Sequence, residues 1–166
     1  MPTSRWSLLL PSLAMFACGP AKPTVDIAAE ERTIHRLTDS IAGLEVKRDV
    51  EAVLSFYAPD AILQIPGAPS LVGRDAQRPV VKEFFSLPFT DEVMKNRTVV
   101  VAASGDLAYD IGADNLITKT ATGQTEETGK SIIIYRKIGG EWKVVANSYS
   151  TDAAPAPMPA AAPSTK

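Results

Sequence analysis

The sequence predicts a single α+β domain in which helices pack against one face of a curved antiparallel sheet. Two observations lead to this class. Apolar residues recur at helical spacing in the first third of the domain, whereas its second half contains four long runs typical of strands. Helices followed by a series of hairpin-connected strands are typical of folds in which the two kinds of element form separate layers.

Three helices are predicted. In the first, residues 25–46, the apolar residues follow one another at intervals of seven, seven and three and so share one stripe: Ile27, Ile34, Ile41 and Leu44. Asp49 is a suitable N-cap for a second, shorter helix that continues to Tyr57 and ends at Pro59. A third helix is expected over residues 74–85, entered through Gly73.

Five segments have the composition of strands. The first covers residues 61–65 and is followed by a turn rich in proline and glycine. The other four come later in the chain, at residues 97–103, 107–118, 130–138 and 141–150. Because the connections between these four are short and contain glycine, we expect antiparallel hairpins.

Composition excludes several classes of protein. The chain has 166 residues, of which 45% are hydrophobic, with a net charge of -2, one Cys and one His. A single Cys supports neither a disulfide scaffold nor a zinc–thiolate site. Because there is no basic surplus, we expect no nucleic-acid partner. No motif for a phosphate cradle or a metal occurs, so we expect neither a cofactor nor a metal.

The N-terminus has the features of an export signal. Arg5 supplies a positive charge, and the apolar segment after it is too short to cross a bilayer. Residues 1–17 end in Ala17, directly before Cys18, which resembles the lipobox of bacterial lipoproteins. That resemblance implies diacylation of Cys18, whereas the alternatives are an ordinary secretory signal or a buried cysteine.

The resemblance to lipoproteins also implies a location at the bacterial cell envelope. Gly19 follows Cys18 where an Asp would resemble an inner-membrane retention signal, which favours the outer membrane, facing the periplasm, in a host with two membranes. Residues 18–25 are then a linker and residues 26–151 the folded domain. Residues 152–166 are rich in alanine and proline and are expected to be disordered.

Four motifs in the folded part resemble the NTF2-like superfamily, and within it the SnoaL-like and DUF4440 domains. They are DVEAVLSFYAPDA at residues 49–61, GRDA at 73–76, GDLAYDIG at 105–112 and YRKIGGEWKVV at 135–145. The resemblance implies a cone, in which a curved antiparallel sheet wraps around three helices and leaves an apolar pocket. Known members of the superfamily include ketosteroid isomerase, cyclases and dehydratases, so the fold does not by itself define a function.

The resemblance also permits a test for isomerase chemistry, which needs a carboxylate base and two acidic hydrogen-bond donors. The positions that correspond to these three groups are Ile65 for the base, Ile41 for the tyrosine and Ile133 for the aspartic acid. Because isoleucine neither accepts a proton nor stabilises an enolate, isomerase activity of the known kind is not expected. We expect these residues, with Asn147 and Tyr149 of the last strand, to line an apolar ligand pocket.

Four polar residues are weak catalytic candidates. His35 and Asp39 are separated by one helical turn, so they form either a carboxylate-oriented base or a pair on the flank of the helix. Asp110 and Asp114 share one face of a strand. They approach the pocket if that face is concave and are simply solvated if it is convex.

Two classes of function remain open. The first is a non-catalytic envelope lipoprotein that binds a small hydrophobic ligand, or an interaction module that forms a homodimer through its sheet. The alternative is a SnoaL-like enzyme, such as an isomerase, dehydratase or cyclase, that uses His35, Asp110 or Asp114. The loss of the isomerase groups favours the first class.

Overall fold

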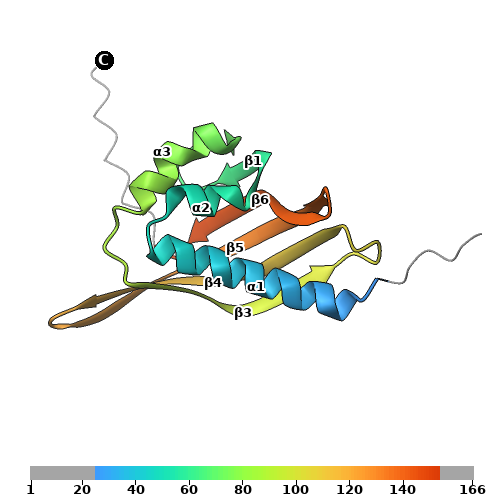
Figure 1. The fold of residues 1–166 in the computed structure, drawn as a ribbon. Helices are drawn as coiled ribbons and strands as arrows, with labels where there is room; N and C mark the ends of the chain where they lie inside the picture. Colours follow the sequence, from blue (N-terminus) through green and yellow to red (C-terminus); the bar gives the residue numbers. More distant parts are fainter. Residues whose placement is uncertain (1–24, 154–166) are drawn as a thin grey trace, which may run out of the picture.

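A computed structural model describes residues 25–153 as three helices and one six-stranded sheet (Figure 1). The predicted signal peptide, Cys18 and most of the predicted C-terminal tail lie outside these residues. The elements follow in the order α1 (Ile27–Val46), α2 (Val50–Ser55), β1 (Tyr57–Gln64), β2 (Leu71–Val72), α3 (Arg74–Phe84), β3 (Asp91–Val101), β4 (Leu107–Thr120), β5 (Gly123–Ile138) and β6 (Glu141–Thr151). None of the helices in residues 25–153 is both long and apolar enough to cross a membrane.

Local sequence signals define where the helices begin. The carboxylate of Asp26 accepts a hydrogen bond of 2.9 Å from the Ala29 amide at the start of α1. Asp49 caps α2 in the same way through Ala52, as the sequence predicts. Gly73 precedes α3 with a φ of 83°, a backbone conformation that favours glycine.

The sheet has the strand order β2-β1-β6-β5-β4-β3 and is mixed. Strands β3 to β6 form the predicted antiparallel series, but β1 pairs with β6 in parallel, so the expectation of a wholly antiparallel sheet is wrong in this one place. After β1 the chain passes through β2 and α3 to the far edge at β3, and three hairpins then return it to β6, beside β1. The predicted α+β class, with a sheet curved around helices, is confirmed.

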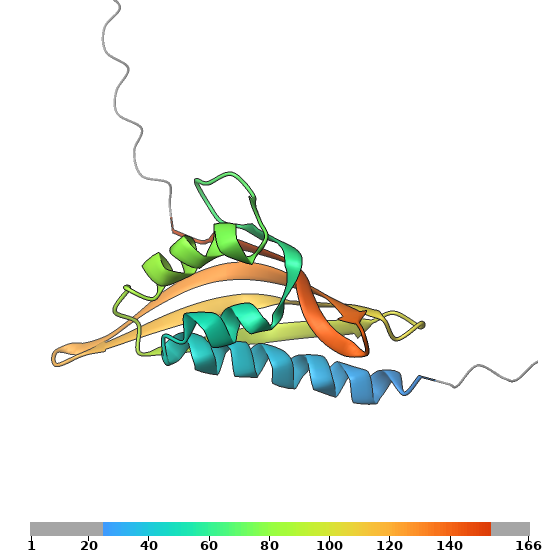
Figure 2. The same ribbon diagram turned by 45° about the horizontal axis from the view of Figure 1, so that its top comes forward.

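The sheet bends around the helices, as Figure 2 shows. Its pairing register shifts at three places: between Tyr57 and Ile62 in β1, between Lys95 and Thr98 in β3, and between Ile134 and Tyr135 in β5. Such irregularities bend and twist a strand locally. Three strands of the sheet therefore bend, and the helices lie in the resulting concavity.

Several boundaries differ from those expected from the sequence. Strand β1 begins at Tyr57, which the periodicity placed at the end of the second helix, because Tyr57 and Ala58 are both buried in the core. Strands β3 and β5 begin six or seven residues earlier than predicted. Their early residues are mostly polar, so an apolar pattern is absent there, and those of β5 belong to the hairpin that extends beyond the helices (Figure 1). The two-residue strand β2 was not predicted.

Candidate functional site

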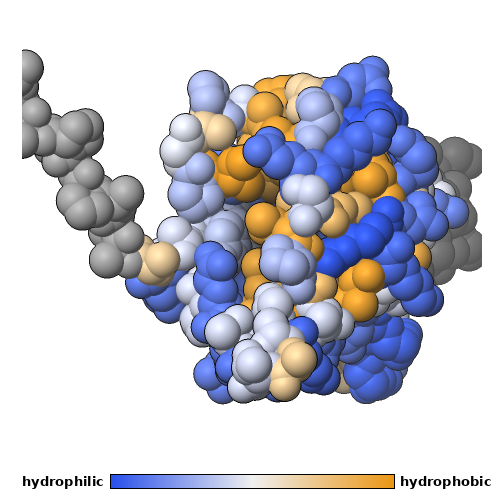
Figure 3. Space-filling view, turned by 90° about the vertical axis from the view of Figure 1, so that its left-hand side faces the viewer, coloured by the Kyte–Doolittle hydropathy of each residue, from blue (hydrophilic) through white to orange (hydrophobic). Residues whose placement is uncertain are grey.

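A cavity of about 290 Å³ lies between the concave face of the sheet and the three helices. It is near the C-terminal ends of α1 and α3, and Figure 3, viewed from that end of the molecule, shows hydrophobic side chains exposed between hydrophilic ones. Every element except β2 contributes to its lining. The apolar side chains of these elements are Ile41, Val53, Leu63, Val80, Val81, Phe84, Met94, Leu116 and Ile133.

All five residues expected to form a ligand pocket lie in this lining. Ile41 comes from α1, Ile65 from the segment after β1, Ile133 from β5, and Asn147 and Tyr149 from β6. The Tyr149 ring packs directly over Gly129 of β5, where an added Cβ would lie 2.4 Å from the ring. Occupation of the cavity by a ligand stays a prediction.

One wall of the cavity is acidic, a feature that the sequence patterns do not predict. The carboxyl groups of Glu45, Glu92 and Asp114 reach it from α1, β3 and β4. The carboxyls of Glu45 and Glu92 lie side by side, close enough for one, when protonated, to donate a hydrogen bond to the other. Most of the lining is therefore apolar, but this wall is acidic.

The surroundings of these carboxyls disfavour their charged forms. Burial raises the pKa of Glu45 to about 7, and burial together with the neighbouring Glu45 raises the pKa of Glu92 well above its ordinary value. Burial also raises the pKa of Asp114. The wall consequently holds protons near neutral pH, where isolated carboxyls would be ionised.

Three buried polar atoms in the cavity have no hydrogen-bond partner in the described part of the protein. They are Oε2 of Glu92, Oγ of Ser131 and Oδ1 of Asn147. Ser131 is only 4% exposed, and although its hydroxyl lies near Asp114, no hydrogen bond of normal geometry joins them. The amide of Asn147 does donate to the Tyr57 hydroxyl at 3.0 Å. Unpaired buried atoms are costly and usually point to a partner that is not part of the chain.

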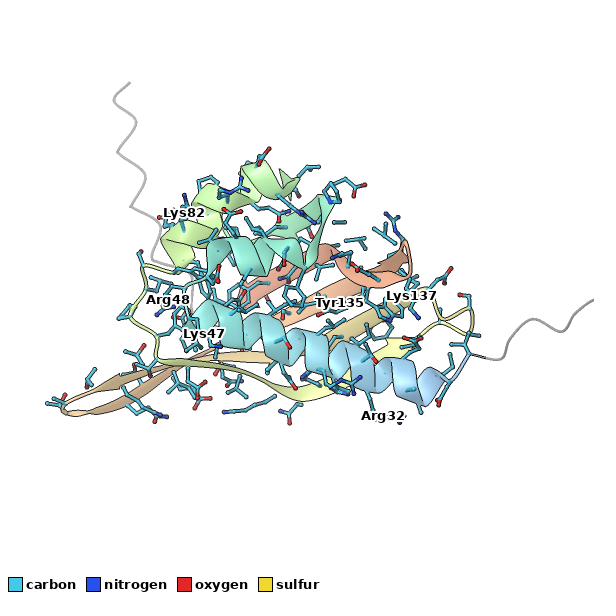
Figure 4. The ribbon with its side chains drawn as sticks, viewed as in Figure 1. Arg32, Lys47, Arg48, Lys82, Tyr135 and Lys137 are labelled. Carbon is cyan, nitrogen blue, oxygen red and sulfur yellow. The ribbon has the colours of Figure 1, made fainter. Side chains whose placement is uncertain are left out.

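Asp110 faces the concave side of the sheet but serves the packing of α1. It is fully buried and forms an ion pair with the guanidinium of Arg97, which also binds Asp39. The Thr38 hydroxyl donates to Asp110 at 2.7 Å and lies 2.8 Å from the hydroxyl of Tyr135. Figure 4 labels Tyr135, which lies between α1 and the sheet. Because Asp110 is fully buried and accepts hydrogen bonds from Arg97 and Thr38, it is not free to act on a substrate, whereas Asp114 lines the cavity.

The predicted pair of His35 and Asp39 is not formed. Asp39 binds Arg97, and the His35 backbone carbonyl accepts a further hydrogen bond from Arg97 at 3.3 Å. Neither side chain is among those that line the cavity. Both residues therefore connect α1 to Arg97 of the sheet.

One feature of the sequence indicates an acidic residue at the cavity. Glu45 lies one helical turn after Ile41, so it continues the apolar stripe of α1 as a single charged residue. Glu92 gave no such signal, because it precedes the segment predicted as a strand. In residues 25–153, no group of three or more His, Cys, Asp or Glu residues is placed to hold a metal ion.

Comparison with known proteins identifies a SnoaL-like domain over residues 37–145. Among solved structures, a ketosteroid isomerase-like protein from Erwinia carotovora atroseptica is 26% identical, with a TM-score of 0.64, covering 75% of this chain and 98% of that one. An NTF2-like protein from Novosphingobium aromaticivorans is 17% identical, with a TM-score of 0.65, covering 77% of this chain and 86% of that one.

The association domain of C. elegans CaMKII is also similar, at 17% identity and a TM-score of 0.64, covering 75% of this chain and 97% of that one. Comparison with curated proteins gives no match.

The Arg97–Asp110 pair provides a test of the role assigned to Asp110. Replacement of Arg97 by Met leaves a carboxylate that is 0% exposed without its counter-ion, so we expect the free energy of unfolding to fall by about 3–5 kcal/mol. Asp39→Asn is the matched control, because it removes a partner of the same arginine that is 68% exposed, and should cost less than about 1 kcal/mol. Urea denaturation at neutral pH measures both, and equal losses would contradict the assignment.

Proposed function

The chain belongs to the SnoaL-like family, and we propose that its domain binds a small, largely apolar molecule in the cavity between the helices and the sheet. The observation that carries the proposal is a partly open, mainly apolar cavity whose lining also contains buried polar atoms without partners. Ligand sites typically combine such an apolar surface with a few polar groups that fix orientation.

The size of the cavity limits the ligand. Its volume is about 290 Å³. This is the lower end of the range for small-molecule sites. A molecule with a single ring or a short chain fits these dimensions.

An enzymatic role is the second candidate, supported by the acidic wall. Since Ile41, Ile65 and Ile133 line the cavity, the groups of the known isomerase reaction have no counterpart there. A carboxyl with a pKa of about 7, as in Glu45, is nevertheless well suited to proton transfer at neutral pH. An enzyme of this kind would use Glu45, Glu92 or Asp114 in place of His35 and Asp110.

Recovery of a bound molecule tests the binding proposal. We expect mass spectrometry of extracts from the purified full chain to detect a reproducible small molecule. Leu116→Trp, which fills the cavity, should abolish its recovery, whereas Leu107→Trp should not, because Leu107 lies on the opposite face of the same strand and is 47% exposed. Recovery from the Leu116→Trp variant would contradict the proposal. Conversion of the molecule during incubation with protein would favour the enzymatic candidate.

We further propose that the convex face of the sheet joins two copies of the chain. A row of apolar residues crosses this face in register, on five neighbouring strands: Val100, Tyr109, Ile134, Ala146 and Ile62. Val100, Tyr109 and Ile62 are 38–40% exposed, and Ile111 beside them is 43% exposed. A contiguous exposed apolar patch of this kind is typical of an interaction surface, and an isologous contact would cover it on both copies.

The oligomeric state in solution tests this proposal. We expect light scattering to give the mass of a dimer at micromolar concentration and that of a monomer for the double variant Tyr109→Lys, Ile111→Lys, because two buried charges on each side oppose association. Glu127→Lys, on the hairpin that extends beyond the helices, is the control and should remain dimeric. A monomeric wild type would exclude the proposal.

Lipid attachment at Cys18 is proposed from the sequence alone. Two acyl chains on this residue would anchor the domain durably at a membrane. We expect Cys18→Ser to abolish labelling with palmitate and to move the protein from the membrane fraction to the soluble fraction. Because Cys18 is the one cysteine of the chain, loss of label assigns the site directly. Unchanged membrane association would refute the anchor.

A further inference from the structure

We propose that the molecule in the cavity carries a protonated amine, and that Glu45, Glu92 and Asp114 bind this group. The inference rests on the proposed function, since it requires the cavity to take a ligand. It goes further by naming the chemical class: an apolar amine of modest size.

The distribution of charge around the cavity is one-sided. Carboxyl groups enter it from α1, β3 and β4, while α2 and α3 contribute only apolar side chains. Among the described residues that line it there is no Lys, Arg or His. The guanidinium of Arg48 is close enough to influence Glu92, but it donates its hydrogen bonds to the carbonyls of Leu87 and Phe89 and stacks on the Phe89 ring. Within residues 25–153, no cation is therefore placed in the cavity to balance the three acids.

The unpaired atoms indicate a ligand that donates hydrogen bonds. Oε2 of Glu92 and Oδ1 of Asn147 are acceptors, and Oγ of the buried Ser131 is able to accept as well. An ammonium group has three donors and no acceptor. It would donate to the carboxyl oxygens of the wall and balance their charge, which neither a carbonyl compound nor a carboxylic acid does.

The remaining titratable groups at the cavity do not supply a positive charge. Tyr57 and Tyr149 line it from β1 and β6, and burial raises the pKa of both phenols, so they stay neutral. Behind this lining, Asp110 and Arg97 neutralise each other.

The proposal has a consequence for pH. Without a ligand, protons occupy the wall near neutral pH, because burial raises the pKa of Glu45 to about 7 and that of Glu92 well above its usual range. A bound ammonium ion favours the ionised carboxyls, so these protons must leave when the amine enters. The affinity for an amine should consequently rise between pH 5 and pH 8, and that for a neutral alcohol should stay constant.

Three probes with the same eight-carbon chain separate the effect of charge from that of apolar contact: n-octylamine, 1-octanol and octanoate. Calorimetry with the full chain at pH 8 measures their affinities. We expect the amine to bind at least about tenfold more tightly than the alcohol, since hydrogen bonds between charged groups are stronger than those between neutral groups. Octanoate should bind most weakly. Glu92→Gln should reduce the affinity for the amine about tenfold and leave that for the alcohol unchanged.

The control variant is Glu141→Gln, a glutamate at the start of β6 whose side chain is 74% exposed and which does not line the cavity, and it should leave all three affinities unchanged. Glu92→Gln should fold. The Glu92 carboxyl has a raised pKa in the folded state, so its ionisation lowers the free energy of unfolding as the pH rises above about 4.5. The amide of the variant does not ionise and so avoids this loss. Urea denaturation at pH 8 should therefore show that Glu92→Gln is more stable than the wild type.

The outcomes distinguish this inference from the proposed function. If the amine and the alcohol bind equally well, or if Glu92→Gln weakens both alike, the cavity binds ligands but the amine class is wrong. If no probe binds at all, and nothing is recovered from the purified chain, both proposals fail.

Discussion

The buried ion pair between Arg97 and Asp110 determines where the longest helix lies on the sheet. Arg97 of β3 holds Asp39 and the His35 carbonyl of α1, while Asp110 of β4 accepts from Thr38 of the same helix. A buried charge pair is stable only when its geometry is nearly ideal and its remaining atoms are bonded. This network therefore sets the helix at one distance from the sheet, which apolar contacts alone define less sharply.

The cavity follows from that placement. The middle of α1 packs on the sheet through Ile34 and Thr38, whereas its C-terminal part presents Ile41 and Glu45 to the cavity. The sheet curves away there, and α3 covers the space from the other side with Val80, Val81 and Phe84. Helix α1 thus contributes both to the packed core around the Arg97–Asp110 ion pair and to the cavity. The position of the cavity therefore depends on this ion pair.

The sequence predicts the parts of this arrangement that repeat regularly. The stripe of α1 and the antiparallel hairpins follow from periodicity, and the motif order places Ile41, Ile65 and Ile133 around one cavity. The partners of Asp110 could not be foreseen in this way, because Arg97 and Thr38 lie 13 and 72 residues from it, and only the folded sheet brings them together. Glu92 was missed because the edge strand that carries it is too polar to be recognised as a strand.

The buried carboxyls of the acidic wall lower the stability of the fold, which indicates that they are present for another reason. Side chains of Gln or Met at positions 45 and 92 would occupy similar space without the cost of desolvating two neighbouring carboxyls. Above about pH 4.5 this cost grows, because the unfolded chain releases its protons more readily than the folded one. Departures of this kind from the most stable sequence concentrate at functional sites. A ligand that pairs with the carboxyls would offset the cost, which is a physical reason for placing the site at this wall.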